Sequence, residues 1–226
     1  MRNADFRMKT KKVKTMKRSV LFGIVTAFAA ILLSACAEKG PVPLDIGYRP
    51  LADVAAGTPK VVVGVSPFKD DRGKAASVLG RRVIASTGLE NELVVQGTVA
   101  DLVASRLKDA LKARGITVKD VPAWDMTAEN IKADGVDIVI GGEIKTLWVE
   151  ALSKLLNANT RADVQLRVSA ADTAEKKVFR TLELNSKLER QDIAFSFTQV
   201  EIVLSEALSG ALDQLLNDEE FKKRIK

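Results

Sequence analysis

The chain of 226 residues contains no histidine and a single cysteine, Cys36. Without an imidazole it lacks the usual general base near neutral pH and the commonest zinc ligand, and one thiol forms neither an internal disulfide nor a cysteine-rich metal site. Aromatic residues are also scarce, at 5%. These absences argue against histidine and thiol catalysis, and we expect no enzymatic activity, no catalytic residues, no cofactor and no metal site.

Cys36 stands at the end of a segment typical of exported lipoproteins. Eight basic residues lie between positions 2 and 18, an apolar run covers residues 20–33, and Ser34 and Ala35 directly precede the cysteine. The run is shorter than the roughly 20 residues of a transmembrane helix. We predict that residues 1–35 are a signal peptide, that the Cys36 thiol receives diacylglycerol, and that the new amino terminus receives a fatty acid such as palmitate. The alternative is an uncleaved membrane anchor.

Removal of this segment changes the charge of the chain. The full sequence has 35 Lys and Arg against 29 Asp and Glu, but the part that begins at Cys36 has 27 against 28. A nearly neutral domain has no basic footprint for nucleic acid. We therefore expect no nucleic-acid partner, a membrane contact through the lipid anchor, and an envelope protein as a candidate partner.

Residues 36–59 are predicted to be the lipidated amino terminus and a flexible tether. The 23 residues from 37 to 59 contain four prolines and three glycines and have no hydrophobic period. Fully extended, they reach on the order of 75 Å, enough to hold a domain away from a membrane surface. Residues 60–226 are expected to form a single periplasmic α+β domain.

The first half of that domain alternates strands with one helix. Apolar residues 60–65 predict a buried strand, residues 78–85 a short edge strand or an ordered loop, and residues 116–121 another short strand. Between them, Thr98 is the predicted N-cap of a helix that ends at Gly115. The apolar face of this helix comprises Val99, Leu102, Val103, Leu107, Ala110 and Leu111.

The second half predicts a helical turn at 127–132, a long strand at 136–149, two alternating strands at 164–170 and 178–188, and a final helix. Thr198 and Glu201 have the spacing of a capping box for that helix. Trp124 is expected in the core. The predicted fold is an α+β two-layer sandwich, with a mixed, mainly antiparallel sheet of four to six strands and two long helices packed on one face.

The order of these elements resembles the YajG-like family of bacterial outer-membrane lipoproteins. The similarity rests on the lipoprotein signal, a valine-rich strand followed by Asp70-Asp71-Arg72, a helix ending in Ala113-Arg114-Gly115, and a last helix leading to Asp218-Glu219-Glu220-Phe221. The resemblance implies an outer-membrane lipoprotein whose domain faces the periplasm and has no established enzymatic activity. Ala37, in place of an aspartate after the cysteine, also implies the outer membrane.

Three short motifs have structural explanations that are simpler than a binding role. Asp70-Asp71-Arg72 is expected to hydrogen-bond its own turn rather than a cation or phosphate. Gly141-Gly142 suggests a strand bulge rather than close approach of a ligand. Gly80-Arg81-Arg82 suggests a solvated loop rather than a lipid-headgroup contact.

Leu152, Leu155 and Leu156 fall in a connection, residues 151–160, that is expected to be an exposed loop. The favoured interpretation is a short helix that folds these leucines onto the open end of the sheet. The alternative is an exposed apolar cluster that contacts a partner or a membrane. Trp148 fits either arrangement.

Two functions follow from these patterns. The first is a non-enzymatic, membrane-anchored envelope lipoprotein that docks on or assists an envelope assembly or transport system. The alternative is a periplasmic carrier that binds lipid or another apolar ligand between sheet and helices. A lined cavity of several hundred Å³ in the structure would favour the carrier, and a filled core with an exposed apolar patch would favour docking.

Overall fold

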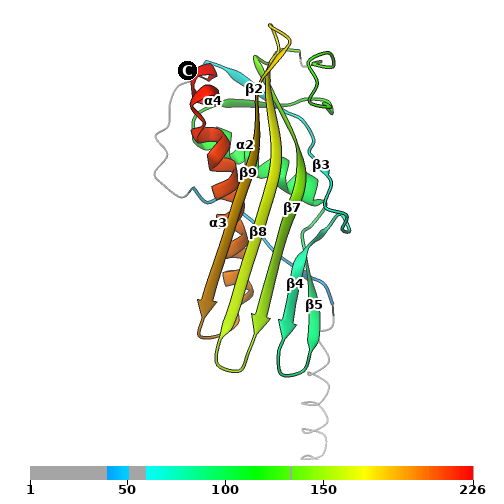
Figure 1. Cartoon of the computed structure of the whole chain (residues 1–226), viewed down its shortest axis with the longest axis vertical. Helices are drawn as coiled ribbons and strands as arrows, with labels where there is room; N and C mark the ends of the chain where they lie inside the picture. The colour runs from blue at the N-terminus through cyan, green and yellow to red at the C-terminus, as the bar shows by residue number, and fades with distance from the viewer. Residues whose placement is uncertain (1–39, 51–59, 133, 226) are drawn as a thin grey trace, which may run out of the picture. The chain divides into compact units, whose positions relative to one another are not determined.

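The computed structural model describes residues 40–50, 60–132 and 134–225. Residues Pro41–Lys226 form one compact α+β unit, in which a mixed sheet is covered on one face by helices (Figure 1). The predicted signal peptide and Cys36 lie outside the described residues.

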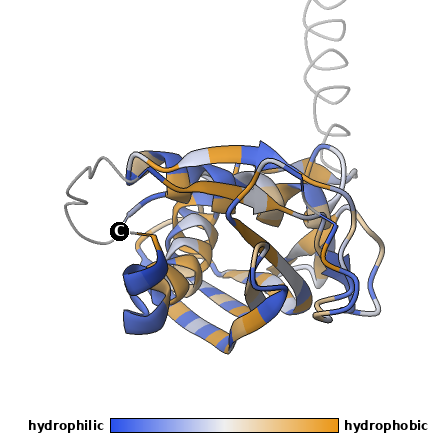
Figure 2. Cartoon of the chain, turned by 90° about the horizontal axis from the view of Figure 1, so that it is seen from above, coloured by the Kyte–Doolittle hydropathy of each residue, from blue (hydrophilic) through white to orange (hydrophobic). Residues whose placement is uncertain are grey.

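Three long strands form one side of the sheet. Strands β7 (Ile138–Ser153), β8 (Ala158–Asp172) and β9 (Lys177–Asp192) run antiparallel to one another as a meander. Their side chains alternate between the helix-covered face and the opposite face, which we call the outer face. Figure 2 shows this alternation as orange (hydrophobic) and blue (hydrophilic) bands along strands. The predicted alternating strands at 164–170 and 178–188 are confirmed within β8 and β9. Strands β7 and β8 are longer than predicted, so only residues 154–157 separate them.

The other edge of β7 pairs with three short strands that follow one another in the sequence. Strands β2 (Val62–Val65), β3 (Lys69–Asp70) and β4 (Val78–Ile84) lie parallel to β7, opposite residues 138–140, 143–144 and 149–153 respectively. Residues 62–84 therefore behave as one strand with two interruptions.

Three further strands complete the sheet. Strand β5 (Leu89–Val94) pairs antiparallel with β4, β6 (Thr117–Asp120) pairs parallel with β2, and β1 (Val42–Pro43) pairs parallel with β5. The sheet thus has nine strands and not four to six. The two-residue strands are too short to alternate, and β5 has three polar residues in six, so neither type carries a recognisable strand pattern. Strand β4, predicted at an edge, lies between β5 and β7.

Helix α2 (Val99–Ala113) begins and ends as predicted. The Thr98 side chain accepts a hydrogen bond from the Asp101 N–H at 3.1 Å, and Gly115 follows with a φ of +78°, a left-handed conformation that suits glycine. The buried residues of α2 are the six that the sequence predicts.

Helix α3 (Phe197–Asn217) covers β8 and β9, and the short helix α4 (Glu219–Arg224) follows it. The predicted capping box is wrong, because the N-cap is Ser196 and it makes no side-chain capping bond. The Glu201 carboxylate instead accepts a hydrogen bond from the backbone of Asp45. Residues 127–132 form turns without a helix.

The main core lies between the helices and the sheet, and both α2 and α3 contribute to it. A smaller cluster on the outer face joins Trp124 and Ile131 to Val139 and Ala171. Trp124 is buried there as predicted.

Residues 41–50, which we call the strap, are not a flexible tether. Leu44 and Ile46 are buried in the main core, and β1 pairs with β5. After β1, the backbone N–H groups of Asp45, Gly47 and Arg49 donate hydrogen bonds to the side chains of Glu201, Ser205 and Ser209, respectively. Every second residue of the strap is thus bonded to every fourth residue of α3. Two extended residues rise about 6.6 Å and four helical residues rise about 6 Å, so the two repeats match.

Candidate contact surface at one end of the sheet

Three connections meet at one end of the sheet. In the strand register, Ile84 pairs with both Leu89 and Ser153, Ser153 pairs with Ala158, and Ala158 pairs with Asp192. The connections that leave these strand ends therefore lie side by side, at the bottom of Figure 1. We call residues 85–89, 154–157 and 193–196 the loop end.

The loop end gathers exposed apolar side chains. Leu155 is 93% exposed, Ile193 90%, Leu156 80% and Leu89 49%. Over the ranges that the structure describes, these are the four exposed large hydrophobic residues. The favoured interpretation of a short helix that buries the leucines is wrong, since residues 154–157 form a tight turn. Leu152 lies in β7 and is half-buried, so it is not part of the exposed cluster.

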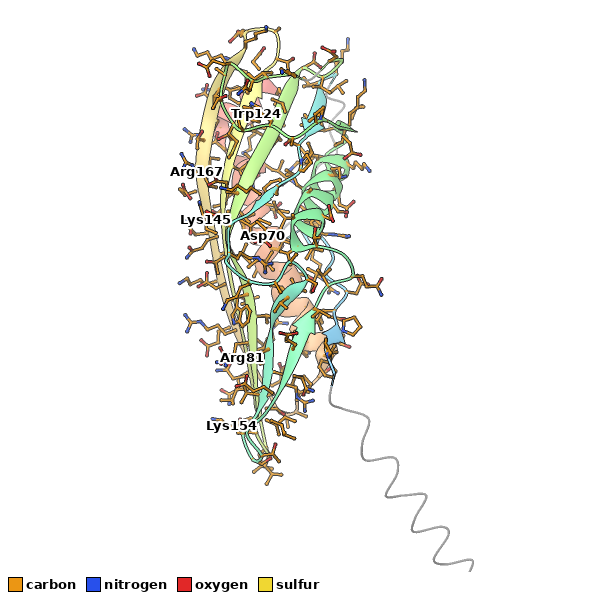
Figure 3. All side chains as sticks on the ribbon, turned by 90° about the vertical axis from the view of Figure 1, so that its right-hand side faces the viewer. Asp70, Arg81, Trp124, Lys145, Lys154 and Arg167 are labelled. Carbon is orange, nitrogen blue, oxygen red and sulfur yellow. The ribbon has the colours of Figure 1, made fainter. Side chains whose placement is uncertain are left out.

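The loop end also differs from the rest of the chain in charge. Lys154 is the one charged residue among its thirteen, and none is acidic, whereas 28% of the whole chain is charged. Figure 3 shows Lys154 at this extremity. A surface of exposed leucine and isoleucine with few charges is costly in water and favours contact with another apolar phase or surface.

Side chains behind the loop end hold the connections in place. The Arg82 guanidinium lies over the Phe195 ring at 3.8 Å, and Phe195 packs edge-to-face on Phe197 with ring centres 4.8 Å apart. Arg82 belongs to β4, so this stack joins β4 to the connection that leads into α3. Arg81 and Arg82 therefore lie in a strand and not in a solvated loop.

Asp70 and Arg72 form an internal clamp. Arg72, whose side chain is 3% exposed, donates to both carboxylate oxygens of Asp70 at 2.8 Å, and also to the carbonyls of Val78 and Leu147. It thereby fills the second interruption in residues 62–84, where neither β3 nor β4 pairs with Leu147. The Arg72 guanidinium lowers the pKa of the Asp70 carboxyl below its ordinary value. The motif stabilises the fold, as the simpler explanation predicts.

The paired glycines of β7 make room for aromatic side chains. A Cβ on Gly142 would meet the Phe68 ring at 2.5 Å, and one on Gly141 would meet Trp124 at 3.1 Å. The predicted bulge occurs instead between Ile144 and Thr146. Phe68 belongs to the main core and Trp124 to the outer-face cluster, so close packing on both faces of β7 explains this pair.

A pocket of about 660 Å³ lies on the outer face, beside the Arg72 turn. Trp148 lies in its lining, with the Lys74 ammonium 5.2 Å from the ring centre. Lys145 and Arg81, both labelled in Figure 3, also line it. The lining holds five basic and two acidic side chains, and the pocket does not lie between sheet and helices, where a carrier is expected to bind its ligand.

The layer between sheet and helices is filled. A water-sized void in this layer would leave accessible surface on the side chains around it. Core side chains from the sheet and from helices α2 and α3 have none: Val63, Leu107, Leu111, Ile140, Ile144, Val149, Val164, Leu204, Leu208 and Leu212. This packing opposes an apolar-ligand cavity among these residues.

Two further kinds of feature bear on the described residues, a cluster of metal-ligating side chains and a membrane-spanning helix. No group of three or more Cys, Asp or Glu side chains in residues 40–50, 60–132 and 134–225 is placed to hold an ion. Among the helices of the same ranges, none is both long and apolar enough to cross a bilayer.

Sequence reasoning missed both the strap and Ile193. One signal was available for the strap: Glu201, Ser205, Ser209 and Asp213 recur every fourth residue along a helix that is otherwise apolar on that side. Ser205 and Ser209 are fully buried, and the Tyr48 hydroxyl donates to Asp213 at 2.6 Å. A polar row inside an apolar helix face indicates a hydrogen-bonding chain packed across it.

No family model and no curated protein matches the chain. Solved structures with a similar backbone include XCC0632 of Xanthomonas campestris, a DUF330 protein, with 12% identity over 77% of this chain and 91% of that one and a TM-score of 0.49. A putative neuraminyllactose-binding hemagglutinin homolog from Helicobacter pylori has 10% identity, coverage of 81% and 96%, and a TM-score of 0.44. Lipoprotein GNA1162 of Neisseria meningitidis has 12% identity, coverage of 70% and 99%, and a TM-score of 0.37.

Proposed function

We propose that this protein is a lipid-anchored, non-enzymatic lipoprotein of the bacterial outer membrane, of the YajG-like type. Its anchor is Cys36, its domain faces the periplasm, and it works by docking within an envelope assembly or transport system. The signal before Cys36 supports the anchor.

The observation that carries this role at the envelope is the loop end, an apolar surface suited to contact a partner or a membrane. The large apolar side chains exposed within the described ranges gather at one extremity instead of being scattered over the surface. Monomeric soluble domains rarely keep such a cluster unless it meets something. The filled sheet–helix layer argues against the carrier function, because no apolar cavity separates the two layers among the core residues.

The anchor is tested by Cys36→Ser in the full-length chain. Cells are fed a labelled fatty acid and then fractionated. We expect the natural protein to incorporate label and to sediment with outer membranes, and the variant to do neither. Incorporation of label by the variant would refute the anchor. Sedimentation with inner membranes would refute the outer-membrane assignment alone.

The docking role is tested against the carrier on the Cys36→Ser protein purified from the soluble fraction. Organic extraction followed by mass spectrometry should recover no stoichiometric lipid. One lipid per chain, recovered reproducibly, would establish the carrier instead.

A further inference from the structure

We infer that the loop end rests on the same lipid bilayer that holds the acylated Cys36. This inference rests on the proposed lipid anchor and adds the orientation and the occupant: the exposed leucines and isoleucine contact phospholipid, not a protein.

The first observation is the direction in which the chain enters the domain. Val42 pairs with Leu93 and Pro43 with Val94 in a parallel ladder. Going back along the strap from Val42 therefore means going along β5 from Leu93 toward Leu89, which belongs to the loop end. The chain reaches the domain from the side of the loop end.

The hydrogen bonds to α3 give the same direction independently. Asp45 bonds Glu201 in the first turns of the helix, and Arg49 bonds Ser209 further along. Helix α3 begins directly after the 193–196 connection, so the strap rises away from the loop end. Both contacts of the strap, with β5 and with α3, have the same polarity.

The second observation is the length of chain that remains. Cys36 lies six residues before Val42, and six residues span at most about 20 Å. From Leu93 back to Leu89 is four residues of strand, or about 13 Å. A membrane that holds Cys36 must therefore lie within about 20 Å of Val42, only a few ångströms beyond the loop end. Docking of the strap removes the long tether that the sequence predicted.

The third observation is the chemistry of the loop end. Four exposed apolar side chains, Leu89, Leu155, Leu156 and Ile193, point to an apolar phase, and Lys154 is the single charge beside them. Absence of acidic residues from these three loops suits a surface with anionic headgroups. The short chain between Cys36 and Val42 thus holds the bilayer close to the loop end, which is the described surface whose side chains suit contact with lipid.

The experiment uses the acylated protein that begins at Cys36, in vesicles of phosphatidylethanolamine and phosphatidylglycerol. Since acylation consumes the Cys36 thiol, an introduced cysteine is the only free one. Leu155→Cys carries an environment-sensitive fluorophore, and Ala174→Cys, in the turn between β8 and β9, is the matched control. The 15 residues of β8 place the control about 45 Å from the loop end.

We expect bromolipids to quench the probe at position 155 several-fold more than the probe at 174, and aqueous iodide to show the reverse order. Equal responses at the two positions would overturn the inference. Shielding at 155 in native membranes but not in lipid vesicles would also overturn it, since a protein would then cover the loop end. A chain that carries no acyl groups and does not float with vesicles refutes the anchor itself, which is a separate readout.

A second variant measures the contribution of the leucines to membrane contact separately from that of the short chain that links Cys36 to the domain. The probe is placed at Ile193→Cys in acylated protein that also carries Leu155→Asp and Leu156→Asp. We expect these two changes to shift the equilibrium by about 10-fold or more, from the loop end in contact with the bilayer to the loop end in water. Lipid quenching at 193 should fall accordingly, while the thermal midpoint stays unchanged because both leucines are exposed. Undiminished quenching would mean that the leucines contribute nothing to seating.

Discussion

Replacement of Ile46 by alanine tests whether the strap is part of the folded domain. Ile46 is 2% exposed and lies in the main core, although its neighbours in sequence have the composition of a linker. Truncation of a buried isoleucine removes apolar surface from the core and leaves a cavity, at a cost of 2–5 kcal/mol in the free energy of unfolding. Tyr48 and the three strap N–H donors restrain the backbone nearby, so we expect little collapse of the cavity and a loss of about 3 kcal/mol.

The assay is thermal and denaturant unfolding of the chain that begins at residue 37, followed by circular dichroism. For a domain of this size, 3 kcal/mol corresponds to a fall of about 6–12 °C in the thermal midpoint. Asp45→Ala is the matched control, because the Asp45 side chain is exposed and its backbone N–H bond to Glu201 survives the change. It should shift stability by less than about 0.5 kcal/mol.

Equal stabilities of Ile46→Ala and Asp45→Ala would refute the reasoning. The segment would then be a tether, as its prolines and glycines suggest, and the domain could stand away from the membrane. The short distance between Cys36 and the folded domain, on which the proposed membrane contact of the loop end depends, would then no longer hold.

Two further predictions concern the edge of β7. A Cβ on Gly80 would lie 1.8 Å from the Val149 carbonyl oxygen, so Gly80→Ala should break the β4–β7 pairing and lower the free energy of unfolding by about 3 kcal/mol or more. The control is Gly47→Ala, which has no atom within 4 Å of the new Cβ and should change stability by less than about 1 kcal/mol. Equal effects of the two substitutions in denaturant melts would contradict this prediction. Asp70→Asn should cost about 2–3 kcal/mol at pH 7, because it leaves the buried Arg72 guanidinium without its anion. Since Arg72 lowers the folded-state pKa of Asp70, the stabilisation is present above the unfolded pKa, near 3.8, and is lost as pH falls through the folded value. The difference between wild type and variant should therefore shrink below pH 4, and a constant difference down to pH 2 would show that the ion pair is not its source.

The elements that sequence reasoning identified correctly are those with a repeating local pattern. Helix α2 has a cap, an apolar stripe and a terminal glycine, all within its own residues. Strands β8 and β9 alternate over many residues, and their turn is short. In each case the signal lies within one segment, because burial of one face imposes a period on that segment.

The elements that it missed have their reasons elsewhere in the chain. Strand β3 is two residues long and pairs with a strand more than seventy residues away. Glu201 has the spacing of a capping-box residue, but its carboxylate serves the strap. Asp70 and Arg72 could be recognised as a turn, while the role of Arg72 as donor to the Leu147 carbonyl depends on an interruption in strand pairing that no local pattern records.

The amino-acid sequence alone predicts the export signal, the lipid anchor at Cys36 and the neutral charge of the remaining chain, because these depend on composition and on residues adjacent to one another. It also excludes histidine and thiol chemistry from the domain, because the necessary groups are not there. Only the tertiary structure decided that residues 41–50 pack on α3, and that three connections far apart in the sequence place Leu89, Leu155, Leu156 and Ile193 at one end. Register between distant strands brings those loops together, and register is a property of the assembled sheet.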